Sequence, residues 1–91
     1  MATRLANGEA MTPEQVREQI EQALPGATVE VRSGDNVHFE ALVIASQFAG
    51  LRTIARHQLV YRALGAVVGT EIHALSLETL APDEWAQRGT G

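Results

Sequence analysis

Two strand-forming segments, separated by the turn residues 34–36, constrain the fold more than any other feature of the sequence. In residues 27–33, Val29 and Val31 alternate with charged residues, which is the period of a half-buried strand. The second segment, residues 37–45, ends in a run that is apolar on both faces, as expected of a central strand. Together the two segments predict a β-hairpin.

Helical segments flank this hairpin. Thr12-Pro13-Glu14-Gln15 is a capping box with proline at the first helical position, so we expect a helix that ends at Pro25-Gly26. A longer helix is predicted over residues 51–68, a third strand over residues 72–80, and a short helix from Pro82. The order α-β-β-α-β-α predicts an α/β (α+β) two-layer sandwich. It should contain a three-stranded mixed sheet, with helices on one face and a parallel pair joined by a right-handed crossover.

The spacing of apolar residues assigns the faces of the long predicted helix. We expect the buried side to carry Leu51, Ile54, Ala55, Leu59, Ala63, Val67 and Val68. We expect the solvent side to carry Arg52, Arg56, His57, Gln58 and Arg62. Outside this helix, Phe48 and Trp85 are predicted to pack as anchors.

The length of 91 residues suits one domain with a thin core. We expect a disordered tail over residues 1–11, a single domain over residues 12–88 and a flexible end over residues 89–91. The sequence has neither an apolar run long enough to span a membrane nor a secretory signal, so we expect a cytoplasmic protein with no membrane partner.

The sequence contains no cysteine, so neither a disulfide nor a thiolate ligand is available. Soft-metal chemistry would have to use histidine, or sulfur from a partner. The net charge of −4 disfavours generic binding to phosphate backbones. Because the sequence shows no Ser-His-acid arrangement, phosphate loop or metalloprotease motif, we expect no catalytic residues.

Three segments, taken in order, resemble the BolA family. The first is His38-Phe39-Glu40, at the start of the second strand. The second is Phe48-Ala49-Gly50-Leu51 followed by Arg56-His57-Gln58-Leu59-Val60-Tyr61, which is similar to the family's F-x-G…R-H-x-x-V-Y signature. The third covers residues 72–77 and 79–85 and is similar to the ending V-H-A-L…T-P-x-x-W. The resemblance extends over residues 11–87.

The resemblance implies a class II KH-like fold and a monothiol glutaredoxin as partner. In such heterodimers a [2Fe–2S] cluster is shared with the glutaredoxin and glutathione, for iron–sulfur trafficking or iron and redox sensing. Carried over to this sequence, one ligand is His73. The second comes from the hairpin, where His38 and Asp35 are both candidates. The isolated protein is expected to hold no cluster and to be a monomer or weak homodimer. Since histidine ligates metal in its neutral form, cluster binding should weaken below about pH 6.5.

Each candidate also has a simpler interpretation. His73 and His38 could be structural or surface histidines, and Asp35 could be a turn residue that binds its own backbone. The stripe formed by Arg52, Arg56, His57 and Arg62 could contact a partner, glutathione or nucleic acid, or could be a solvated helix face.

A second functional hypothesis is a KH-like nucleic-acid-binding transcriptional regulator of the stress response, with DNA as a weaker partner. The KH-like architecture and the arginine stripe favour it. Two features oppose it: the acidic net charge, and the absence of the Gly-x-x-Gly loop with which KH domains clamp the backbone, since Gly50 is followed by Leu51, Arg52 and Thr53.

Overall fold

The first helix begins at its capping box. The hydroxyl of Thr12 accepts a hydrogen bond from the Gln15 amide at 3.2 Å, and the Gln15 side chain accepts one from the Thr12 amide at 2.8 Å. The computed structural model describes residues 11–65, 68 and 74–90. Its elements are α1 (Pro13–Ala23), β1 (Thr28–Arg32), β2 (His38–Ile44), the 3-10 helix η1 (Ser46–Phe48), α2 (Thr53–Leu64), β3 (Ala74–Leu80) and α3 (Pro82–Thr90).

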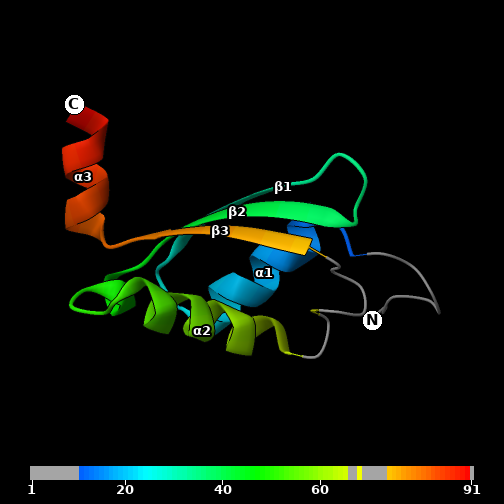
Figure 1. The fold of residues 1–91 in the computed structure, drawn as a ribbon, viewed down its shortest axis with the longest axis horizontal. Coiled ribbons are helices and arrows are strands. Elements are labelled where there is room, and N and C mark those ends of the chain that lie inside the picture. Colours follow the sequence, from blue (N-terminus) through cyan, green and yellow to red (C-terminus); the bar gives the residue numbers. More distant parts are fainter. Residues whose placement is uncertain (1–10, 66–67, 69–73, 91) are drawn as a thin grey trace.

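The three strands form a mixed sheet in the order β1-β2-β3. β1 pairs antiparallel with β2, and β2 pairs parallel with β3 in a register that places His38 opposite Ala74. α1 and α2 cover one face of the sheet, whereas α3 extends from the end of β3 toward the other side (Figure 1). The predicted α+β fold with a mixed sheet is confirmed, with α3 lying outside the helix layer.

The core lies between the sheet and the two covering helices. Phe48 is fully buried, as its predicted anchoring role requires. Met11, which was expected in the tail, is also buried, so the packed domain includes one residue more than predicted. The largest fully buried side chains are Phe39, Phe48, Ile20, Leu64, Val16, Val43 and Val60.

The predicted faces of the long helix are partly wrong. Ile54 is 69% exposed, whereas Arg56 is only 8% exposed. The buried stripe consists of Arg56, Val60 and Leu64, one helical turn apart. α2 also ends at Leu64, four residues before the predicted end, because Gly65 follows with a φ of 63° that glycine tolerates.

The predicted anchor Trp85 is only partly buried. It is 42% exposed on α3, and it lines an open pocket together with residues of β1 and β2, among them Thr28 and Leu42. α3 continues to Thr90, into the segment expected to be flexible. Among the described helices, none has the length and hydrophobicity that crossing a membrane requires.

Candidate functional site

Asp35 organises the turn between β1 and β2. Its Oδ1 atom accepts hydrogen bonds from the backbone amides of Val37 and His38, at 3.0 and 2.9 Å. Ser33 accepts from the Asn36 amide at 2.8 Å and donates to the His38 carbonyl at 2.7 Å. Asn36 has a φ of 58°, a left-handed conformation in which asparagine is enriched. These contacts confirm that Asp35 is a turn residue.

The same carboxylate orients the ring of His38. Asp35 Oδ2 lies 2.8 Å from His38 Nδ1, although the two side chains are 54% and 71% exposed. The His38 amide, then its ring and the Val37 amide hold the pKa of Asp35 well below its usual range. A carboxylate that accepts from Nδ1–H favours the tautomer whose Nε2 lone pair is free to bind a metal. His38 can therefore act as a ligand, with Asp35 as its positioning residue.

An open pocket of about 590 Å³ lies beside this histidine. His38 lies on the sheet face opposite the helices, because it alternates with the buried Phe39. The start of β3 contributes Ala74, whose amide donates to the Val37 carbonyl at 3.2 Å. The pocket is lined by Arg32, Ser33, Gly34, Asp35, His38, Phe39, Glu40, Ala74 and Ser76. The predicted ligand His73 precedes Ala74 in the sequence and lies outside the described residues.

The hairpin offers one candidate metal ligand, the imidazole of His38, with a supporting carboxylate from Asp35. Within the part of the chain that the structure describes, no group of three or more histidine or carboxylate side chains could hold a metal ion. An exposed imidazole with a supporting carboxylate fits the nitrogen ligation found in some iron–sulfur clusters, provided that sulfur ligands come from elsewhere.

Arg56 is absent from this site because its guanidinium is engaged inside the domain. It donates to the Leu51 carbonyl at 2.9 Å, to the Thr79 carbonyl at 3.1 Å, and to both carboxylate oxygens of Glu84 at 2.7 and 3.0 Å. It also lies 5.9 Å from the centre of the Phe48 ring. Its predicted place on the solvent side is wrong, since these contacts connect α2 to β3 and α3.

The ion pair shifts both titrating groups. Hydrogen bonding to Glu84 raises the pKa of Arg56. The Arg56 guanidinium, followed by the Ala81 amide, lowers the pKa of Glu84 from 4.5 to about 2. Glu84 was not among the residues predicted from sequence, although it lies three residues after Ala81, as a capping residue does. The Ala81 amide donates to Glu84 at 2.8 Å.

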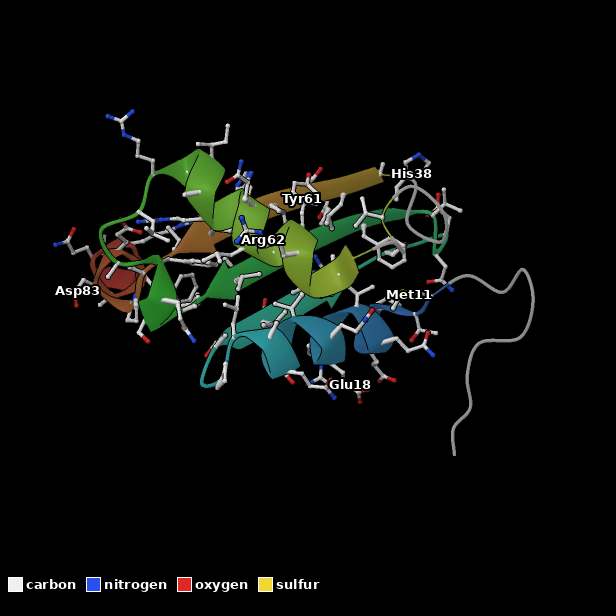
Figure 2. All side chains as sticks on the ribbon, turned by 90° about the horizontal axis from the view of Figure 1, so that it is seen from below. Met11, Glu18, His38, Tyr61, Arg62 and Asp83 are labelled. Carbon is white, nitrogen blue, oxygen red and sulfur yellow. The ribbon has the colours of Figure 1, made fainter. Side chains whose placement is uncertain are left out.

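The other residues of the predicted stripe do not converge on His38. Arg52 and Arg62 are exposed at α2, and His57 is half-buried on the same helix. His38 is the first residue of β2 and points from the opposite side of the sheet, and Figure 2 shows it apart from Tyr61 and Arg62 of α2. The structure thus joins Asp35 with His38 and separates both from the α2 residues.

Comparisons with known proteins agree with this fold. The family model for BolA-like protein matches residues 9–84. Human BolA-like protein 1 is 32% identical over 81 residues, covering 79% of this chain and 59% of the human protein. The DNA-binding transcriptional regulator BolA of Vibrio cholerae is 42% identical over 57 residues, covering 63% of this chain and 54% of that protein.

The chain thus spans a little over half the length of these two relatives. The structure of a BolA homologue from Coxiella burnetii superimposes with a TM-score of 0.70 at 42% identity, covering 84% of this chain and 97% of that one. The fold and the sequence match together show that the chain belongs to the BolA-like protein family.

Proposed function

We propose that this protein is a non-enzymatic adaptor that binds a monothiol glutaredoxin and contributes histidine ligands to a shared [2Fe–2S] cluster. The observation that carries the proposal is the oriented, exposed imidazole of His38 at the hairpin. Its strand position is directly opposite Ala74, the residue that follows His73. His73 and His38 would provide nitrogen ligands, and Asp35 would position the ring of His38.

The chemistry of the chain supports a shared cluster. With no cysteine, the protein cannot provide the four thiolates that hold an ordinary cluster. A glutaredoxin cysteine and glutathione would supply the sulfur. Histidine ligation raises the reduction potential of a cluster relative to thiolate ligation, which is the chemistry that the imidazoles add. This suits cluster transfer or iron and redox sensing.

Reconstitution with a monothiol glutaredoxin tests the proposal. The purified protein, a monothiol glutaredoxin, glutathione, ferrous iron and sulfide are combined without oxygen, and visible absorption and circular dichroism are recorded on the isolated complex. A coloured heterodimer is expected, with a spectrum distinct from that of the glutaredoxin alone. Failure of several monothiol glutaredoxins to form any complex would contradict the proposal.

Substitutions assign the ligands and the positioning residue. His73→Ala and His38→Gln should each change the visible spectrum or abolish it. Asp35→Asn keeps the backbone contacts of an Asx turn but removes the carboxylate that orients His38. It should weaken cluster retention about tenfold while leaving the type of cluster unchanged. His57→Gln is the matched control, because this histidine lies on α2, and it should leave the spectrum unchanged.

A nucleic-acid-binding regulator remains the second candidate, since relatives of this chain carry that name. The exposed cations Arg52 and Arg62 would be its contacts. Tight, salt-dependent and sequence-selective binding to duplex DNA in a gel-shift assay, weakened by Arg52→Gln and Arg62→Gln, would favour this function.

A further inference from the structure

The outer face of α2 carries an unusual concentration of exposed apolar side chains. Ile54, Gln58, Tyr61 and Arg62 follow one another at helical spacing, and Leu51 lies two residues before the helix, next to its N-cap Arg52. Of the four large apolar side chains that are exposed among the described residues, three belong to this surface: Leu51, Ile54 and Tyr61. Figure 2 shows Tyr61 on the side of α2 that faces away from α1.

The charge of this surface is the reverse of that of the whole chain. The protein carries a net charge of −4, yet α2 contains no carboxylate. Arg52 and Arg62 have no hydrogen bond or ion pair with any residue that the structure describes. The other described arginines are all paired with carboxylates. Two exposed cations without a partner among the described residues therefore border an apolar centre.

We propose that this α2 surface, formed by Leu51, Arg52, Ile54, Tyr61 and Arg62, is a docking site for an acidic amphipathic helix of a partner protein. Apolar side chains of the partner at i, i+3, i+4 and i+7 would cover Ile54 and Tyr61, and flanking carboxylates would pair with Arg52 and Arg62. Tyrosine and arginine around an apolar centre are typical of protein interfaces. A surface of one helix face corresponds to a weak or transient contact.

The apolar centre favours a protein over a nucleic acid. Phosphate contacts reward cations and polar donors, so a side chain as exposed as Ile54 would add nothing to them. A protein helix uses both components, because apolar contact supplies affinity while complementary charge sets orientation and partner choice. This surface is distinct from the hairpin, so the inference does not depend on cluster sharing.

Binding of two designed peptides to the full chain tests this inference. The first is a fluorescein-labelled helix of about 18 residues, five turns, with leucine at i, i+3, i+4 and i+7 and glutamate on both flanks. The second has lysine in place of every glutamate. Fluorescence anisotropy should show saturable binding of the acidic peptide and at least about fivefold weaker binding of the lysine peptide.

Variants then locate the site. Ile54→Ser should weaken acidic-peptide binding about tenfold, and Arg62→Gln about fivefold, with the fold checked by far-UV circular dichroism. Glu18→Gln on the outer side of α1 is the control and should leave binding unchanged (Figure 2). No saturable binding of the acidic peptide below about 1 mM, or binding that Ile54→Ser does not affect, would overturn the proposal.

Two other occupants give distinguishable results. If a labelled DNA duplex binds and only the arginine variants weaken it, while the acidic peptide fails to bind, the surface is a nucleic-acid contact. If sedimentation shows self-association that Ile54→Ser abolishes, the surface is covered by a second copy of the chain. Either result overturns the proposal of an acidic partner helix.

Discussion

Arg56 connects three elements through a single side chain. Its guanidinium contacts a carbonyl before α2, a carbonyl at the end of β3 and the carboxylate of Glu84 on α3. Because the charge is buried and each donor has a partner, removing the side chain would leave two backbone carbonyls without this donor. The attachment of α3 therefore depends more on this residue than on apolar packing.

We expect Arg56→Ala to lower the free energy of unfolding by about 2–4 kcal/mol. Glu84→Gln should have a smaller effect, since Glu84 is partly exposed and glutamine can still accept a hydrogen bond. Urea denaturation measures both. Arg17→Ala breaks the exposed Arg17–Glu21 pair on α1 and should cost about 0.5 kcal/mol or less. An equal loss for Arg56→Ala and Arg17→Ala would contradict the structural role of Arg56.

The same ion pair predicts how stability depends on pH. In the folded protein the pKa of Glu84 falls from 4.5 to about 2, so the unfolded state binds the proton more tightly. The pair therefore stabilises the fold fully above about pH 4.5, and this contribution is lost as the pH falls toward 2. In urea titrations, wild type and Glu84→Gln should converge in stability over this range. If the difference in stability between wild type and Glu84→Gln stayed constant from pH 5 to pH 2.5, the Arg56–Glu84 pair would not be the source of the pH dependence.

Some of these residue contacts can be predicted from sequence and others cannot. Asp35 in a turn, three residues before His38, is a local pattern, and the turn interpretation is confirmed. The pairing of Arg56 with Glu84 joins residues 28 positions apart, so helical periodicity alone places the arginine on the solvent side. Ile54 was predicted to be buried and is exposed, because apolar character alone does not establish burial.

Elements differ in how firmly they are held. Helix α1, β2 and η1 contribute buried apolar side chains to one core, whereas α3 contributes none that is fully buried. α3 is attached instead by the Arg56–Glu84 pair and by an ion pair between Arg88 and Glu78. The apolar pattern predicted each α-helix and strand, but it did not locate the end of α2, since that end is marked by the left-handed backbone of Gly65 and not by a change in apolar spacing.

This difference predicts unequal losses of stability when Phe48 and Trp85, the two aromatic residues expected to act as anchors, are replaced. Phe48→Ala should lower the free energy of unfolding by about 3–5 kcal/mol, because it opens a cavity in the core. Trp85→Ala should cost less than Phe48→Ala, since 42% of Trp85 is already exposed and its removal opens no cavity in the core. Thermal and urea denaturation followed by far-UV circular dichroism give both values. A larger loss for Trp85→Ala would mean that α3 packs more tightly than the structure shows.

At the scale of the whole molecule, the sheet separates two surfaces. His38 lies on the face that α1 and α2 leave open, while Ile54 and Tyr61 are exposed on α2, with Tyr61 on the side of that helix that faces away from α1 (Figure 2). The buried apolar core lies between them. Among the described residues, no hydrogen bond or ion pair joins the hairpin to α2. Two partners could therefore occupy the protein at the same time.

We expect the two surfaces to function independently. His38→Gln should change the spectrum of the glutaredoxin complex while leaving acidic-peptide affinity within about twofold of wild type, and Ile54→Ser should do the reverse, because substitutions without shared partners are additive. The double variant should show the sum of the two single losses. Cluster spectra and peptide anisotropy measured on one set of proteins test this. If Ile54→Ser also disrupted the cluster, or His38→Gln reduced peptide binding, the glutaredoxin and the helix would compete for one continuous interface.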